Sequence, residues 1–255
     1  MPLELVTIPC RTDNYAYLIH DADTGETAVV DVPDAAPILA ALKARGWALS
    51  RILLTHHHGD HIDGVAELRA ATGATVAGNA ADAARLPPLD LPLTAGATFT
   101  LGRDLAHVID VSGHTIGHIA FHFPESALAF TADSLMAGGC GRLFEGTPAQ
   151  MWASLAKLAA LPPETVICSG HEYTTANLAF AATIEPENAA LAARITATAT
   201  ARAANRPTVP SRLREEAATN PFLRAHLPHI KAAVGMAGAS DAAAFAEIRA
   251  RKDRF

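Results

Sequence analysis

A run of metal-capable side chains directly after an apolar strand is the feature that most constrains this chain. The segment LLTHHHGDHIDG holds four histidines and two aspartates between His56 and Asp63. In an extended backbone, side chains two residues apart point the same way. His56 and His58 are therefore predicted to reach one ion together, while His57 faces away from it.

The second part of the same run addresses a second position. Gly59 permits a turn, after which Asp60 and His61 point to a different place from the first pair. Imidazole and carboxylate are ligands that suit zinc, iron or manganese. A solvated polar loop is the alternative, but protonated imidazoles repel one another, so their clustering favours a metal centre. Asp63 precedes the apolar run Val65–Leu68 and is predicted to cap a helix rather than to bind metal.

Three more ligand-type side chains lie just beyond predicted strands elsewhere in the chain, and these are His114, Asp133 and His171. Taken singly, each has another explanation, as a turn residue, a helix N-cap or a surface histidine. It is harder to explain in that way why several strand ends all carry ligand-type side chains. Catalytic and binding residues commonly lie on loops that a rigid sheet positions. The pattern therefore extends the predicted metal centre to these three residues.

The order of the predicted elements favours an α/β domain followed by a small helical domain. Strands are predicted at Thr27–Val30, Arg51–Leu54, Thr75–Ala77, His107–Val111, Ile119–Phe123, Ala127–Phe130 and Thr165–Cys168. Two helices, the second with Thr147 as its N-cap, are predicted at Pro37–Arg45 and Pro148–Ala160. After about Glu172 the strand-like runs disappear, and helices are predicted at Thr174–Thr183, Pro186–Ala204, Arg212–Ala218 and Ala242–Arg251.

Composition and charge narrow the class of protein. The 255 residues carry a formal net charge of -6, and an acidic balance argues against a nucleic-acid binder. The N-terminal residues lack the basic and apolar segments of a signal peptide, and no apolar run is long enough to span a membrane. The three cysteines, Cys10, Cys140 and Cys168, form no CxxC pair, which fits a reducing compartment. We therefore predict a cytoplasmic protein without nucleic-acid or membrane partners.

These motifs resemble the metallo-β-lactamase superfamily, whose THxHxDH signature is present here as THHHGDH. Within that superfamily the chain is most similar to the glyoxalase II family, the hydroxyacylglutathione hydrolases. The similarity spans nearly the whole chain and rests on FTADSLMAGGCGRLFEGTPAQM, GHEYT, TNPFLR and the C-terminal RKDRF. It implies an α/β fold, with an αββα catalytic sandwich over residues 1–171 and a small all-helical, glutathione-binding domain over residues 172–255.

The resemblance also implies two divalent metal ions, zinc first, with iron or manganese as alternatives. One ion would be held by His56, His58 and His114, the other by Asp60, His61 and His171, with Asp133 bridging the two. Two metals that share a water lower its pKa and supply hydroxide at neutral pH, so no Ser or Cys nucleophile is required. Asp60 and Asp133 would be the catalytic residues. The implied substrate is the thioester S-lactoylglutathione, hydrolysed to D-lactate and glutathione in the second step of methylglyoxal detoxification.

Four residues match the family's glutathione contacts, namely Arg142, Tyr173, Arg249 and Lys252. The basic C-terminal run RARKDR has another explanation, as a solvated helix end that suits the helix dipole. Arg142 stands where relatives often have Lys, which keeps the charge but changes its geometry. Phe144 stands where some relatives have Tyr and so lacks a hydroxyl. A monomer is expected, and acyl-group selectivity stays open.

Three other functions are alternatives to the thioesterase. A persulfide dioxygenase of the same superfamily, with a single iron and glutathione persulfide as substrate, would be expected to have a shorter C-terminal region. A superfamily nuclease or phosphodiesterase is disfavoured by the acidic charge. A metal-storage or scaffold protein is disfavoured by the complete set of ligand-type residues.

Overall fold

The computed structural model describes residues 2–255, which divide into two compact units. The first unit consists of residues 2–110 and 117–131, and the second of residues 111–116 and 132–255. The chain thus contributes a short segment to the second unit, returns to the first, and enters the second again after residue 131. The predicted ligands are divided between the two units, so each group has its own structural setting.

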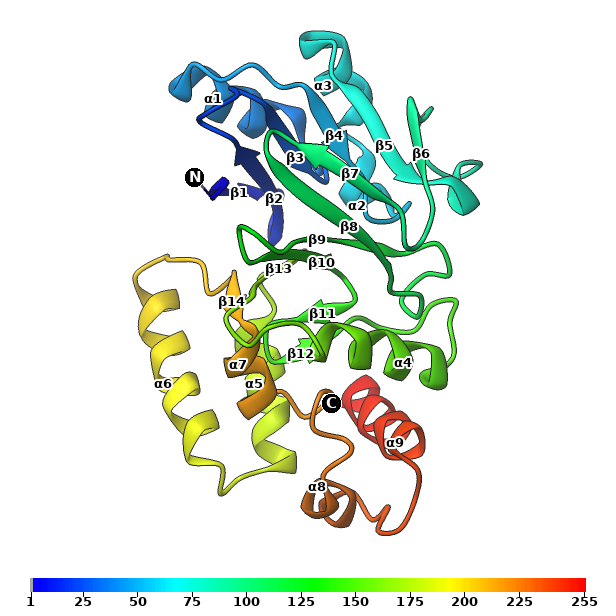
Figure 1. The fold of residues 1–255 in the computed structure, drawn as a ribbon. Coiled ribbons are helices and arrows are strands. Elements are labelled where there is room, and N and C mark those ends of the chain that lie inside the picture. Colours follow the sequence, from blue (N-terminus) through cyan, green and yellow to red (C-terminus); the bar gives the residue numbers. More distant parts are fainter. Residues whose placement is uncertain (1) are drawn as a thin grey trace. The chain divides into compact units, whose positions relative to one another are not determined.

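A six-stranded sheet forms the centre of the first unit (Figure 1). Its strands, in spatial order, are β1 (Glu4–Cys10), β2 (Asn14–His20), β3 (Thr27–Val30), β4 (Arg51–Leu53), β5 (Thr75–Asn79) and β6 (Leu91–Leu93). Pairing is antiparallel from β1 to β3 and parallel from β3 to β6. Parallel neighbours end at the same edge of a sheet, so the residues after β3 and after β4 emerge side by side. The N–H of Asp31 accordingly donates to the Leu53 carbonyl at 2.9 Å.

Helices cover one face of this sheet. They are α1 (Ala35–Arg45), α2 (Gly59–Ile62) and α3 (Val65–Thr72), and the 3-10 turn η1 (Ala80–Asp82) follows β5. Ile38 of α1 and Leu68 of α3 join Leu18 and Ile52 of the sheet in one buried apolar cluster. α1 ends at Arg45 as predicted, and Gly46, which follows, has a φ of 67°, the left-handed conformation that favours glycine.

Four antiparallel neighbours follow in the first unit, and they are β7 (Thr98–Leu101), β8 (Asp104–Asp110), β9 (Ile119–Phe123) and β10 (Leu128–Ala132). β9 has the predicted bounds, but all five of its residues are buried. Phe99 packs edge-on against Phe121 and Phe123, which explains part of this burial. In β9 the large side chains Ile119, Phe121 and Phe123 alternate with Ala120 and His122, but both faces of the strand are buried.

Helices dominate the second unit, in the order α4 (Pro148–Ala159), α5 (Thr174–Ile184), α6 (Ala189–Ala203), α7 (Leu213–Thr219), α8 (Pro228–Ala233) and α9 (Asp241–Arg254). Two short antiparallel ladders accompany them, β11 (Leu135–Met136) with β12 (Gly139–Cys140), and β13 (Val166–Ser169) with β14 (Ser211–Arg212). Thr147 caps α4 in a capping box with Gln150, as predicted. Within residues 2–255, no helix has the length and apolar character needed to cross a bilayer.

Three local expectations are corrected by the structure. The C-terminal region is not wholly helical, because β14 pairs with β13. β1 and β2 were not predicted. β2 is buried along its whole length and shows no polar alternation, and β1 is irregularly buried and contains Pro9. Asp63 does not cap α3. Gly64 occupies that position, and the Asp63 carboxylate instead accepts a hydrogen bond from Arg11 at 2.6 Å.

Candidate metal centre

Four of the predicted ligands lie in the first unit, on the segment that follows β4. His56 Nε2 is 3.1 Å from His58 Nδ1, and His61 Nε2 is 3.8 Å from Asp60 Oδ2. Two ligand atoms that each bind one zinc ion at about 2 Å lie about 3 to 4 Å apart. Each pair therefore has the spacing of two ligands to one ion, in the pairing that strand alternation predicts for His56 and His58 and the turn at Gly59 predicts for Asp60 and His61.

Asp31, which was not predicted from the sequence, supports the imidazole of His61 directly and that of His56 through Thr55. Its Oδ2 lies 2.8 Å from His61 Nδ1 and accepts a hydrogen bond from the Thr55 hydroxyl at 2.8 Å, while its Oδ1 accepts from the Thr55 N–H at 2.9 Å. The Thr55 hydroxyl is in turn 3.0 Å from His56 Nδ1. The only sequence signal for this role was an aspartate directly after a strand.

The surroundings of Asp31 indicate a supporting role rather than metal binding. Asp31 is 3% exposed and has a φ of 57°, a strained conformation that the surrounding bonds must hold. Asp31, His56 and His61 each offer an atom within 4.8 Å of the others. Both Asp31 oxygens, however, already contact Thr55 or His61. Carboxylates that orient metal-binding histidines in this way are common in metal sites.

His57, the middle histidine of the run, contacts another part of the first unit. Its Nδ1 is 3.0 Å from Asp82 Oδ2, at the end of η1. Asp82 is buried and also accepts a hydrogen bond from Arg85 Nε at 2.5 Å. His57 therefore ties the ligand-bearing loop to η1.

The other three predicted ligands lie together in the second unit. Asp133 Oδ2 is 3.4 Å from His114 Nε2 and 3.4 Å from His171 Nε2, and all three residues are buried. His114 Nδ1 lies 2.8 Å from the Arg142 carbonyl, which can only accept, so Nδ1 carries the proton and Nε2 keeps its lone pair. Asp133 Oδ2 therefore lies at ligand spacing from both imidazoles.

The C-terminal helices hold the hairpin that connects Asp133 to Arg142. Buried Glu216 of α7 accepts a hydrogen bond from the backbone N–H of residue 138 at 2.8 Å, and it pairs with Arg194 of α6. Asn220 donates to the carbonyls of residues 136 and 139, at 3.2 and 2.9 Å. The segment that carries the bridging candidate is therefore positioned by side chains from the far end of the chain.

The predicted cationic glutathione contacts lie near one another in the second unit. Burial lowers the pKa of Lys252 below its ordinary value, and the positive charges of Arg249 and Arg142 lower it further. Arg249 is 4% exposed, donates to the Cys140 carbonyl at 3.0 Å and pairs with Asp253 at 2.9 Å. A carboxylate bound among these cations would relieve their mutual repulsion.

Two exposed aromatic rings accompany the ligands of the second unit. Tyr173 is 40% exposed and stacks on His171 with ring centroids 4.7 Å apart. Phe144 is 64% exposed and meets His114 edge-on at 5.3 Å. The position where some relatives have Tyr thus presents an apolar ring to solvent.

The three cysteines are free and buried. Burial raises the pKa of Cys10 and of Cys140 to about 11, and it raises the pKa of Cys168 well above its ordinary value. The thiols stay protonated near neutral pH, and the thiolate is the nucleophilic form. This agrees with a reaction that uses no cysteine nucleophile.

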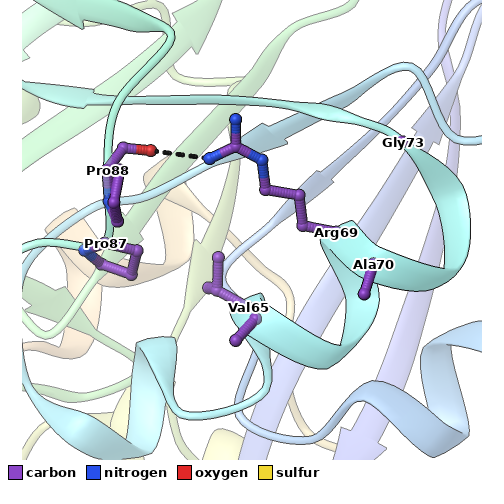
Figure 2. Close-up of a pocket in the computed structure, with 7 residues that line it drawn as sticks. Val65, Arg69, Ala70, Gly73, Pro87 and Pro88 are labelled. Carbon is purple, nitrogen blue, oxygen red and sulfur yellow. Dashed lines mark hydrogen bonds between the residues drawn. The ribbon is translucent and has the colours of Figure 1, made fainter.

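A separate pocket of about 500 Å³ lies in the first unit, between α3 and the segment around Pro87 and Pro88 (Figure 2). Its one charged lining residue, Arg69, donates to the Pro88 carbonyl at 3.1 Å and pairs with Asp90 at 2.8 Å. None of the predicted site residues is among the described residues that line it. The pocket therefore adds nothing to the candidate metal centre.

Comparisons with known proteins identify the family of this chain. Residues 11–171 match the family model of the metallo-beta-lactamase superfamily, and residues 172–255 match the model of the hydroxyacylglutathione hydrolase C-terminus. A hydroxyacylglutathione hydrolase from Cereibacter sphaeroides is 67% identical over 255 residues, with 100% of both chains covered. The crystal structure of ETHE1 from Myxococcus xanthus is 24% identical with a TM-score of 0.69, covering 98% of this chain and 90% of that one. The structure of TTHA1623 in a di-iron-bound form is 33% identical with a TM-score of 0.56, covering 66% of this chain and 91% of that one.

The fold is that of the metallo-β-lactamase superfamily, with mixed α/β sheets and a C-terminal helical domain. Its clusters of His and Asp side chains mark a member that binds divalent metal. Within the superfamily, the chain belongs to the hydroxyacylglutathione hydrolase family. The resemblance and the fold class predicted from the sequence are thereby confirmed.

Proposed function

We propose that this chain hydrolyses the thioester of S-lactoylglutathione to D-lactate and glutathione, the second step of methylglyoxal detoxification. The observation that carries the proposal is the 67% identity to a hydroxyacylglutathione hydrolase over the full length of both chains. The matched region covers the ligand-bearing residues and the helical residues alike. Residues 1–171 are the proposed catalytic domain and residues 172–255 the proposed glutathione-binding domain.

The proposed active site is one binuclear centre, with zinc the first choice and iron or manganese the alternatives. One ion is assigned to His56, His58 and His114, the other to Asp60, His61 and His171, and Asp133 bridges them. Ligand spacing within each unit supports the assignment, as does the di-iron-bound form of a 33% identical relative. Asp60 and Asp133 are the proposed catalytic residues.

The chemistry that such a metal pair supplies when bound is a water whose pKa is lowered toward neutrality. The chain's own part is to hold the ligands still. Asp31 orients His61 directly and His56 through Thr55, so both imidazoles present a fixed ring nitrogen. The Arg142 carbonyl does the same for His114. Because these groups are arranged before substrate arrives, little reorganisation opposes the attack on the thioester carbonyl.

Arg142, Tyr173, Arg249 and Lys252 are the proposed glutathione contacts. Burial, followed by the nearby positive charges of Arg249 and Arg142, lowers the pKa of Lys252. This clustering of positive charge supports an anion site there, and glutathione brings two carboxylates. We also propose a monomer in the cytoplasm with no nucleic-acid partner. The free, buried cysteines fit a reducing compartment, and the net charge of -6 fits a protein that does not bind nucleic acid.

The test is one preparation measured for metal content and for two activities. We expect about two metals per chain, together with loss of thioester absorbance when S-lactoylglutathione is added. The persulfide dioxygenase alternative is not favoured, because residues 172–255 match the hydrolase C-terminus. One iron per chain, with oxygen uptake on glutathione persulfide and no thioester cleavage, would reverse the assignment.

A further inference from the structure

The helix α2 is too short to hold its own orientation. It spans only Gly59–Ile62, yet it carries both Asp60 and His61. An isolated helical turn is unstable in water, because nucleation fixes several backbone angles in return for very few hydrogen bonds. His61 is braced by Asp31. Asp60 needs a brace of its own.

Asn14, at the first position of β2, contacts Asp60 twice. Its Nδ2 donates to the Asp60 backbone carbonyl at 3.0 Å and to Asp60 Oδ2 at 3.0 Å. Asn14 is 4% exposed, and it pairs with Cys10 where the β1–β2 hairpin closes. One amide therefore links the backbone and the carboxylate of Asp60. The oxygen that it contacts is the one that lies 3.8 Å from His61 Nε2.

Arg11, in the same turn, holds the other end of α2. Its guanidinium lies 2.6 Å from Oδ2 of Asp63, the residue that ends α2, and it also donates to the Pro33 carbonyl at 3.2 Å. Its backbone N–H donates to Asp34 Oδ2 at 2.8 Å. Arg11 has a φ of 49°, a conformation that costs energy for a residue with a side chain. The surrounding bonds therefore hold the turn in an unfavourable backbone conformation, in which the Arg11 side chain reaches Asp63 and the Pro33 carbonyl.

We propose that the β1–β2 turn is a positioning element for Asp60, in which Asn14 orients the carboxylate and Arg11 anchors the end of α2. The inference rests on the proposed binuclear function. Both are positioning residues, since they act through Asp60 and its helix. A neutral amide suits this role, because it orients the carboxylate without adding a positive charge that would oppose metal binding.

The test compares metal affinity in Asn14→Leu with that in the wild type. Leu keeps the branched outline of Asn, although it is larger, and it cannot donate a hydrogen bond. Affinity is measured by equilibrium dialysis against a competing chelator, with elemental analysis of the metal retained. We expect one ion to bind about 10–100-fold more weakly, the usual cost of removing a group that orients a ligand. The other ion should keep its affinity. The value of kcat should fall while KM for the thioester stays unchanged.

Asn188→Asp is the matched control. Asn188 caps α6, and Asp caps helices equally well, so the change removes only the hydrogen bond that Asn188 Nδ2 donates to the Ala218 carbonyl at 2.9 Å. If Asn14→Leu does not fold, Arg11→Leu is the second variant to test. Arg11 is partly exposed and contacts the far end of α2, so its replacement should disturb the fold less. It should weaken the same ion by a smaller factor, and Arg11→Lys should restore part of the loss.

The outcomes separate the two proposals. Fewer than two ions, or no thioester turnover, in the wild type contradicts the proposed function. A normal wild type beside an Asn14→Leu protein that binds both ions equally tightly contradicts the positioning role alone. Equal weakening of both ions in Asn14→Leu also contradicts it, because that result indicates a general loss of structure.

Discussion

The two groups of predicted ligands are built in different ways. In the first unit, His56, His58, Asp60 and His61 come from six consecutive residues after one strand. In the second unit, His114, Asp133 and His171 come from three segments that are far apart in the chain. The first group is ordered by its own backbone and by the neighbouring parallel strand. The second is ordered by contacts that only the folded chain provides.

The contrast shows where each group is vulnerable. Asp31 supports two imidazoles of the first group through a few short bonds, so a single change there acts locally. Asp133 belongs to a hairpin segment that depends on Glu216 and Asn220, which both lie more than eighty residues later in the chain. A change in a distant helix can therefore disturb the second group without touching a ligand.

Asp133→Asn should have the largest effect, because it removes the charge that lies between two imidazoles. We expect kcat to fall about a thousandfold or more, since metal-based charge stabilisation is worth several kcal/mol. Metal content per chain should fall as well. Turnover within tenfold of the wild type, with metal content unchanged, would contradict a bridging role.

Glu216→Gln tests the dependence of the second group on distant helices. The change leaves Arg194 buried without its main partner, and breaking a buried ion pair costs about 3–5 kcal/mol. The free energy of unfolding in urea is the measurement. Glu215→Gln is the control, because Glu215 also faces Arg194, at 3.4 Å, but is partly exposed. Its loss should cost about 1 kcal/mol or less. Equal effects would count against the buried pair as the anchor of the hairpin.

Asp31→Asn tests the local support of the first group. Asn tolerates the left-handed backbone of residue 31, so the fold should survive. We expect metal affinity to fall about 10–100-fold, because an amide cannot brace both His61 and Thr55 as the carboxylate does. Competition with a chelator measures the affinity. An unchanged affinity would mean that the loop holds its own shape.

Lys252→Met should act on substrate binding alone. We expect KM for the thioester to rise about tenfold, or ~1.4 kcal/mol, at unchanged kcat, since a charged hydrogen bond is lost. In the wild type, KM should also rise as pH rises through the lowered pKa of Lys252, because the charged form disappears. The Met variant should lack that rise. An identical pH profile of KM in both proteins would remove Lys252 from the glutathione site.

His57→Gln should have the smallest effect. Gln can still donate to Asp82, so the loop should stay tied to η1. We expect kcat/KM to change by less than about threefold, and both metals to be retained. Loss of one metal in this variant would show that the middle histidine is a ligand after all.

Local sequence patterns predicted much of this molecule. The bounds of β3 and β9 and the cap at Thr147 were correct because each depends on neighbouring residues. β2 was missed because a strand that is buried along its whole length shows no polar alternation, and β1 was missed because its burial is irregular and it contains Pro9. Asp63 was misassigned because a good N-cap residue can equally pair with an arginine from a distant turn.

The sequence by itself determined which side chains could bind metal, and it paired His56 with His58 and Asp60 with His61, because backbone geometry links near neighbours. Only the tertiary structure decided what holds them. Asp31 reaches His61 because β3 and β4 lie parallel, and Asn14 reaches Asp60 across 46 positions of chain. Such contacts arise from strand pairing and turn conformation, and they leave no spacing in the sequence from which to read them.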